Sequence, residues 1–380
     1  NVIVDISHEK LDKTFQYIVP DELEDILEVG MLVNIPFGKR IIKGYIMELT
    51  DILEYDIGKL KPIAGTVNES VKIETQLIQL AYWIKKNYGS TMNQALKTVI
   101  PIKKKTKEII RKTIHLAISE ESAKQKLQFF ESKSQVARAR FLRELIEQKS
   151  IDKSVVTSKL NIQSSVIKAF EDMGIVEITS SRNYRNPVSH LQSKGYNLTL
   201  NESQQHVVDE IIKDYDNDIY NTYLLKGVTG SGKTEVYMEL IAHVLSKGRQ
   251  AIVLIPEIAL TYQTVMRFYN RFGNRVSIMN SRLSTGERYD QFERAKNGEV
   301  KIMIGPRSAL FTPFPNLGII IIDEEHEGSY KSETMPKFHA RTVAEWIAKD
   351  TDSALVLGSA TPSLESFYEV EQGNMELFRL

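Results

Sequence analysis

The chain has 380 residues, of which 42% are hydrophobic and 26% charged, an ordinary composition for a globular protein of two or three domains. Its 49 basic and 49 acidic residues balance, so binding to nucleic acid would require locally concentrated positive charge. The absence of cysteine excludes disulfides and Cys-based zinc sites in this sequence, and no apolar run suits a membrane span or a signal peptide, so we expect a cytoplasmic protein.

Residues 1–105 begin with short β-branched runs separated by turn residues: "NVIVDI", "FQYIVP", "MLVNIPFG" and "IIKGYIMEL". The segment "ETQLIQLAYWIKKNYG" then has helical spacing. The pattern predicts a small β-rich domain, a barrel or a sandwich, with an appended helix. From Lys97 to Lys112 the chain holds seven basic residues and one acidic residue. This run is either a solvated linker or an edge that contacts phosphates.

Residues 106–182 include three short helical patterns, "QVARARFLRELIEQ", "DKSVVTSKL" and "QSSVIKAFEDMG", followed by the strand pattern "GIVEITSS". This order predicts a winged-helix domain. Its third helix carries only Lys168 against Glu171 and Asp172, so it suits packing or protein contact as well as DNA. The polar segment at 183–198 has the character of an interdomain linker.

Residues 199–380 alternate strand and helix patterns, which predicts an α/β fold with a parallel sheet of the RecA-like kind. Within "YLLKGVTGSGKTEVY", the residues from Gly227 to Thr234 match G-x-x-x-x-G-K-[ST]. Gly227, Gly230 and Gly232 would let backbone N–H groups close around the phosphates of ATP. Lys233 would reach the β- and γ-phosphates, and the Thr234 hydroxyl would ligate Mg²⁺.

A second acidic motif supports this interpretation. In "LGIIIIDEEHEGSY", four isoleucines predict a strand buried on both faces, and Asp323 follows at its carboxyl end. Asp323 can hold Mg²⁺, and Glu324 can orient and deprotonate the attacking water. Lys233, Asp323 and Glu324 are therefore the predicted catalytic residues of an ATPase.

The four letters D-E-E-H resemble motif II of superfamily 2 helicases, and other segments resemble further motifs of that superfamily. Gln204 is placed like its adenine-reading glutamine, or is a surface glutamine at a helix start. "LIPEIALTYQ" resembles motif Ia, "IGPRSALFTPF" resembles motif Ib, and "LGSATPS" resembles motif III. The resemblance implies single-strand contact by Arg307 and Ser308, and coupling between ATP and DNA by Ser359 and Thr361.

Together, "PEIALT", "GERYDQFERAKNGE", "RSALFTPFPNLG", "DEEHEGSYK", "FHARTVA" and "GSATPS" resemble the PriA family of primosomal replication-restart helicases over essentially the whole chain. The resemblance implies a 3′-end DNA-binding domain at 1–105, a winged helix at 106–182, a linker at 183–198 and helicase lobe 1 at 199–380. It also implies a monomeric ATP-dependent 3′→5′ DNA helicase that recognises stalled or D-loop forks and initiates primosome assembly. The implied partners are branched and single-stranded DNA, primosome proteins and single-stranded DNA-binding protein.

The resemblance also implies residue roles. Phe15, Gln16, Tyr17, Gly38 and Lys61 would form a pocket for the terminal 3′ nucleotide, through aromatic stacking, close backbone approach and a phosphate contact. Gln16 departs from the aspartate expected there. After motif II, a loop would sense single-stranded DNA, and His326 would bridge the ATP and DNA sides or simply pack. The loop residues with this implied role are Tyr330, Phe338, His339 and Arg341.

Other departures from the family pattern are Asn280, Pro306 and Tyr262, none of which belongs to the phosphate-binding motifs. The chain ends soon after motif III, so we expect helicase lobe 2, the cysteine-rich zinc segment and the C-terminal domain to be missing. We accordingly expect zinc only in that missing part, and little ATPase or unwinding activity from this chain. Two alternatives stay open: a DNA-binding scaffold in which ATP turnover is dispensable, and a double-strand translocase.

Overall fold

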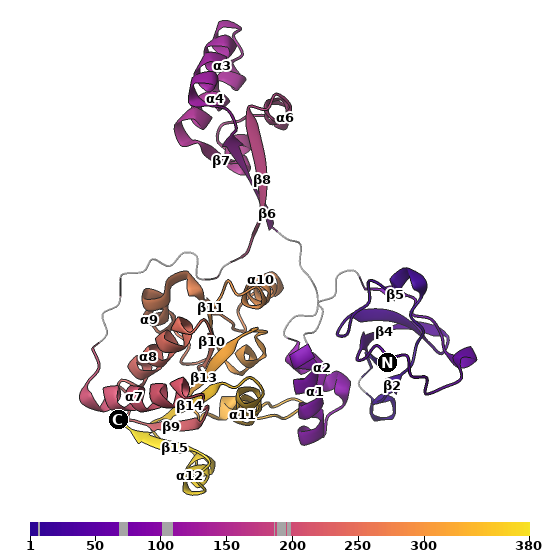
Figure 1. Ribbon diagram of the computed structural model, residues 1–380, viewed down its shortest axis with the longest axis vertical. Helices are drawn as coiled ribbons and strands as arrows, with labels where there is room; N and C mark the ends of the chain where they lie inside the picture. Colours follow the sequence, from indigo (N-terminus) through magenta and orange to yellow (C-terminus); the bar gives the residue numbers. More distant parts are fainter. Residues whose placement is uncertain (7, 68–74, 101–108, 186, 188–194, 196–198) are drawn as a thin grey trace. The chain divides into compact units, whose positions relative to one another are not determined.

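A computed structural model describes the whole chain except residues 7, 68–74, 101–108, 186, 188–194 and 196–198. The described residues form two compact units, one from 1–106 together with 186–380 and the other from 107–185 (Figure 1). Within these residues, none of the helices combines the length and the apolar composition that crossing a membrane requires. The centre of the basic run and most of the segment predicted as a linker lie outside the described residues.

The first 67 residues form the predicted β-rich region as a single antiparallel sheet with the strand order β2-β1-β4-β3-β5. Its alternating apolar residues, among them Val2, Val33 and Ile35, form a core of their own. The sheet leaves β2 at one edge, beside the returning loop that carries η3. The elements are β1 (Val2–Val4), η1 (Glu9–Leu11), β2 (Thr14–Phe15), η2 (Asp21–Leu23), β3 (Leu32–Phe37), β4 (Arg40–Ile46), η3 (Ile57–Lys59) and β5 (Gly65–Thr66).

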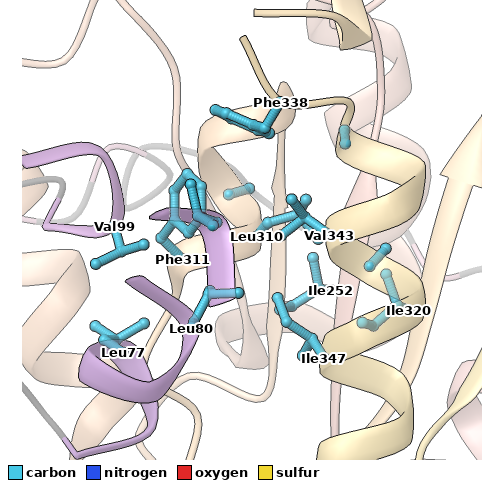
Figure 2. Close-up of a cluster of buried hydrophobic side chains, with 14 of the residues drawn as sticks. Leu77, Leu80, Val99, Ile252, Leu310, Phe311, Ile320, Phe338, Val343 and Ile347 are labelled. Atoms are coloured by element: carbon cyan, nitrogen blue, oxygen red, sulfur yellow. The ribbon is translucent and has the colours of Figure 1, made fainter. Parts of the chain in front are cut away.

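Two helices follow, α1 (Thr75–Tyr88), as predicted, and α2 (Met92–Val99), which begins with a capping box between Thr91 and Gln94. The apolar residues of α1 recur at helical spacing and are buried. They pack in one cluster with side chains of the parallel-sheet region, as Figure 2 shows for Leu80 and Phe311. The rings of Trp83 and Trp346 lie 5.8 Å apart across the same contact. The helix pair is thus an integral part of the larger unit.

The smaller unit contains a three-stranded antiparallel sheet with the order β7-β6-β8, covered by four helices. The three predicted helices are present as α4, α5 and α6, but the linker interpretation of residues 109–112 is wrong, because these residues begin a strand. Phe130, Phe141 and Phe170 pack together at the core. The elements are β6 (Ile109–Leu116), α3 (Glu120–Ser132), α4 (Val136–Gln148), β7 (Ser150–Asp152), α5 (Lys153–Ser158), α6 (Ser164–Asp172) and β8 (Val176–Asn183).

The C-terminal region is the predicted parallel α/β fold, a RecA-like lobe around a seven-stranded sheet with the order β11-β12-β10-β13-β14-β9-β15. Its elements are α7 (Glu202–Asp216), β9 (Thr222–Lys226), α8 (Lys233–Ser246), β10 (Gln250–Leu254), α9 (Tyr262–Phe272), η4 (Gly273–Arg275), β11 (Val276–Ile278), α10 (Thr285–Lys296), β12 (Ile302–Gly305), η5 (Arg307–Phe311), β13 (Leu317–Asp323), η6 (Gly328–Tyr330), α11 (Ala340–Asp350), β14 (Ala354–Ser359), α12 (Leu364–Glu371) and β15 (Glu376–Arg379).

The central strands of this sheet are buried on both faces. Alternate residues of β13 belong to different clusters: Ile319 and Ile321 pack with α7 and α8, whereas Ile320 and Ile322 pack with α11 and η5. This explains the run of four isoleucines. Because all strands are parallel, the segments that follow β9, β10, β12, β13 and β14 meet at one edge of the sheet, where ligands bind in such folds.

Candidate nucleotide and DNA-binding sites

The glycine loop after β9 is folded around its own lysine. Gly230 and Gly232 have φ angles of 84° and 89°, a left-handed conformation that favours glycine. Lys233 begins α8, is 7% exposed, and donates from Nζ to the carbonyl of Gly227 at 2.7 Å and of Val228 at 3.4 Å. Thr234 follows in the first turn of the helix. A buried ammonium therefore lies inside the loop, and its hydrogen-bond partners among the described residues are neutral carbonyls.

Two further observations show that the loop fits an anionic ligand. The Ser231 hydroxyl is buried and has no hydrogen-bond partner among the described residues. The N-terminus of α8 adds a partial positive charge at the same point. A phosphate group would supply the charge that Lys233 lacks and an acceptor for Ser231.

Gln204 contacts this loop directly. Its Nε2 donates to the carbonyl of Ser231 at 2.9 Å, and its Oε1 accepts from the N–H of Asn201 in a capping box that begins α7. A Cβ at Gly232 would lie 2.0 Å from Nε2, so the glycine is required for this contact. The predicted adenine-reading residue is thus beside the site, with its amide already bonded to the protein.

Asp323 ends β13 and is held by Tyr237, a residue that the sequence analysis missed. The Tyr237 hydroxyl donates to Asp323 Oδ1 at 3.0 Å. Burial raises the pKa of Asp323, while the Tyr237 hydrogen bond and the charge of Lys233 oppose the rise. A Cβ at Gly358 would lie 1.5 Å from the Tyr237 hydroxyl oxygen, so glycine is needed on the neighbouring strand β14. The carboxylate is therefore fixed in place, opposite the buried ammonium.

The predicted coupling residues lie together. His326 Nδ1 is 2.7 Å from the Ser359 hydroxyl and 3.7 Å from Glu324 Oε2, and the Thr361 N–H donates to the Ser359 hydroxyl at 3.0 Å. Glu324 itself has a φ of 49°, which turns the chain sharply at the end of β13. The His326 imidazole therefore lies between Glu324, the carboxylate predicted to activate water, and the segment that follows β14.

Arg341 belongs to a buried network and not to a free DNA-contacting surface. Its Nη1 donates to the hydroxyls of Ser363 at 2.9 Å and Ser366 at 2.8 Å, and lies 3.5 Å from Glu325 Oε2. The Glu325 side chain is fully buried and also accepts from the Ser363 N–H at 2.6 Å. The prediction that Arg341 senses DNA by its charge is not supported by this arrangement, because the guanidinium is already bonded inside the protein.

The rings of Tyr330 and Phe338 are also internal, at 1% and 3% exposure. The Tyr330 hydroxyl donates to the carbonyl of Asp323 at 2.7 Å, and Phe338 packs edge-on against Phe311. His339 caps the N-terminus of α11, and burial lowers its pKa. Stacking on DNA needs an exposed ring face, which neither ring offers in this arrangement, and the stacking role of Tyr330 and Phe338 stays a prediction.

The segments that resemble motifs Ia and Ib line one groove of about 490 Å³. Arg307 Nη1 donates to the carbonyls of Ser329, at 2.9 Å, and Lys331, so it connects η5 to the loop after β13. Ser308 lies on the same wall. The departures Asn280 and Pro306 line this groove and not the glycine loop, in agreement with the expectation that they leave the phosphate machinery intact. The other lining residues include Pro256, Glu257, Ser281, Arg288 and Glu333.

A second pocket, of about 380 Å³, gathers all five residues predicted for the 3′ end: Phe15, Gln16, Tyr17, Gly38 and Lys61. The ring of Phe15 meets Phe37 edge-on, with centroids 5.3 Å apart. The Tyr17 hydroxyl donates to the carbonyl of Pro36 at 3.2 Å, and burial raises its pKa. Lys61 Nζ lies 3.4 Å from the carbonyl of Gly38.

The backbone at Gly38 is open to a ligand. Its φ is 62°, and a Cβ built there would meet no other atom within 4 Å. The space above this residue is therefore unfilled, and a ligand can approach the backbone. The pocket is also lined by six residues that the sequence analysis did not single out, namely Lys13, Pro36, Phe37, Tyr55, Lys59 and Leu60. Of these, Lys59 was detectable from its closeness to Lys61 in the sequence.

Comparison with known proteins finds relatives of both regions of the chain. Residues 1–101 match a family model described as 3′DNA-binding domain (3′BD), and residues 197–364 match one described as Type III restriction enzyme, res subunit. Replication restart protein PriA of Bacillus subtilis is 33% identical over 443 residues, covering 100% of this chain and 55% of the relative. PriA of Chlamydia muridarum is 35% identical over 372 residues, covering 94% and 48%.

The chain thus spans about half the length of the curated relatives it matches. Among solved structures, RecG bound to a three-way DNA junction is similar, with a TM-score of 0.37 and 22% identity over 48% of this chain and 24% of that one. This likeness is too weak to carry an argument about function.

Proposed function

Because the chain belongs to the PriA family of replication restart proteins and corresponds to their N-terminal portion, we propose that it recognises the 3′ end of a DNA strand at a branch and carries half of an ATP-driven helicase motor. The observation that carries this proposal is the pocket that brings Phe15, Gln16, Tyr17, Gly38 and Lys61 together. In the whole protein, the activity would be 3′→5′ unwinding at stalled or D-loop forks, leading to primosome assembly.

The pocket suits a terminal nucleotide in its chemistry. Phe15 and Tyr17 offer aromatic surface on which a base can stack. Lys61, with Lys13 and Lys59 beside it, offers positive charge for phosphates in a chain whose net charge is zero. The open backbone at Gly38 admits the sugar closely. An end is the proposed ligand because residues 1–101 match a model described as a 3′ DNA-binding domain.

The lobe suits ATP with Mg²⁺. Thr234 and Asp323 would hold the ion, which neutralises phosphate charge when it is bound. Lys233 would leave the carbonyls of Gly227 and Val228 to meet phosphate oxygens. Glu324 would accept the proton of the attacking water. His326 contacts both Glu324 and Ser359, so it would couple this proton transfer to the segment after β14.

Single-stranded DNA would lie in the groove lined by Arg307 and Ser308. Contact there would reach the ATP site through the carbonyls of Ser329 and Lys331, because Arg307 is bonded to both and Tyr330 between them donates to Asp323. Tyr330 thus takes a coupling role. This short path offers a way for DNA to influence the carboxylates of motif II.

We also propose the finer domain division, with 1–105 as the 3′-end domain, 106–182 as a winged helix and 199–380 as lobe 1. The helix–strand order from α4 to β8 supports the winged helix. We also propose primosome proteins and single-stranded DNA-binding protein as partners of the whole protein, on the family resemblance alone.

Two matched substitutions test the proposal. Lys233→Ala should abolish binding of a fluorescent ATP analogue with Mg²⁺ and leave binding to a 3′-ended DNA junction unchanged. Phe15→Ala should abolish binding to the 3′-ended DNA junction and leave binding of the ATP analogue unchanged. In the whole protein, Lys233→Ala should also abolish unwinding. Loss of both binding activities from either single substitution would contradict two separate sites, and unwinding by Lys233→Ala would favour the scaffold alternative.

A further inference from the structure

Gln16 lies at the 3′-end pocket, where an aspartate was expected, and both ends of its amide are occupied. Nε2 donates to the carbonyl of Ile52 at 2.9 Å, and Oε1 accepts from the N–H of Glu54 at 2.8 Å. An amide can donate and accept at once, whereas a carboxylate can only accept. The residue type therefore matches a clamp on the loop Ile52–Glu54, which uses one N–H of the amide and its carbonyl oxygen.

The clamped loop has little else to hold it. Its apolar side chains point into solvent: Ile52 is 76% exposed and Leu53 is 56% exposed. Burial of apolar surface, the usual source of loop rigidity, is thus missing at these positions. The local hydrogen bond from the Ile52 N–H to the Thr50 hydroxyl, at 3.1 Å, fixes only the start of the loop. Among the hydrogen bonds of the described residues, the two of Gln16 join the centre of this loop to the residue that follows β2.

Tyr55 follows the clamp directly and lines the pocket. The residue is 53% exposed, so its side chain is accessible to a ligand. The next residue, Asp56, caps η3 by accepting from the Gly58 N–H at 3.1 Å, and η3 leads to Lys59 and Lys61. The segment that Gln16 clamps therefore continues into residues that line the pocket together with Phe15, namely Tyr55, Lys59, Leu60 and Lys61.

We propose that Tyr55 is a further base-stacking residue of the 3′-end pocket and that Gln16 is a positioning residue that acts by holding Tyr55 over the terminal nucleotide. This rests on the proposed function of the pocket. The ligand is a terminal nucleotide, held between Phe15 on one wall and Tyr55 on the other. Stacking on an aromatic tolerates any base, so the contact would recognise the end without selecting a sequence.

The test uses the full chain and a DNA junction whose 3′ terminal base is 2-aminopurine, with affinity measured by anisotropy at fixed salt. Tyr55→Ala should weaken binding about tenfold and remove the quenching of the terminal base, whereas Tyr55→Phe should keep both. Gln16→Ala should match Tyr55→Ala, and the double variant should lose no more than either single variant. Tyr82→Ala, an exposed tyrosine on α1 outside the pocket, is the control.

Binding to a covalently closed circular single strand, which has no 3′ end, shows whether a substitution has damaged the fold or general DNA binding instead of the 3′-end pocket alone. Both Tyr55→Ala and Gln16→Ala should bind it as the unsubstituted chain does. Unchanged end binding in Tyr55→Ala, or additive losses in the double variant, would overturn the proposal. If Phe15→Ala and Lys61→Ala also leave end binding unchanged, the proposed function of the pocket fails with it; if they weaken it, only the roles of Gln16 and Tyr55 fail.

Discussion

Leu80→Ala should destabilise the larger unit through the contact between α1 and the RecA-like lobe. Leu80 is 1% exposed and packs in the cluster with Leu310, Phe311 and Ile347 (Figure 2). Truncating a buried leucine to alanine costs about 2–5 kcal/mol, and more where the site cannot collapse. A small cavity of about 40 Å³ is already lined by Leu80 and its neighbours, so truncation would enlarge an existing void. We therefore expect a loss of about 3 kcal/mol in the free energy of unfolding.

Tryptophan fluorescence measures this directly in a urea titration. The chain has two tryptophans, Trp83 and Trp346, and their rings face each other 5.8 Å apart across this contact. The fluorescence transition should move to lower urea in Leu80→Ala. Tyr82→Ala, on the same helix but 61% exposed, should change the free energy by less than about 0.5 kcal/mol. A Leu80→Ala transition that coincides with that of the unsubstituted chain would refute the reasoning, because α1 would then not be packed on the lobe.

Three further outcomes follow from the ATP-site geometry. Burial raises the pKa of Asp323, and Mg²⁺ needs its ionised form, so binding of Mg²⁺–nucleotide should weaken as the pH falls through that raised value. Tyr237→Phe removes a hydrogen bond that favours the ionised form of Asp323, so in a fluorescent-nucleotide titration the loss of binding should begin at a higher pH. Tyr223→Phe breaks a similar bond to Asp214 away from the site and should not change this pH dependence. Arg341→Ala should cost about 3 kcal/mol in thermal unfolding, because Glu325 would lose its nearby buried cation; an unchanged midpoint would contradict the network. His326→Ala should leave nucleotide affinity unchanged in the whole protein and abolish the stimulation of its ATPase by DNA; retained stimulation would show that His326 only packs.

Helices, strands and binding motifs that short sequence patterns define were predictable from the sequence. The spacing of Leu77, Leu80 and Ile84 is enough to identify α1, and the glycine loop and the acidic strand end identify the nucleotide site. The 3′-end residues needed the family resemblance as well, since Phe15 and Tyr17 alone read as ordinary strand residues. The strand β6 was missed because its first residues continue a basic run, while its partner β8 lies more than 60 residues later.

The remaining contacts could not be predicted because they join distant segments. Tyr237 meets Asp323 across 86 residues, and Gln16 meets Glu54 across 38 residues. Nothing in either local sequence marks these pairs. The burial of the loop after motif II could not be predicted for a related reason: Tyr330, Phe338 and Arg341 have the chemistry of DNA contact, but they pack against η5 and α12, which the loop sequence does not reveal.

The central claim is that the first hundred residues recognise a DNA 3′ end. The most direct measurement is anisotropy binding of the chain, at one fixed salt concentration, to two forked DNAs that differ only in whether the strand at the junction ends in a 3′-hydroxyl or a 3′-phosphate. We expect tighter binding to the hydroxyl end, because the match to a 3′ DNA-binding domain predicts recognition of a free terminal nucleotide, and loss of that preference in Phe15→Ala and Lys61→Ala. Equal binding of both DNAs by the unsubstituted chain would contradict it.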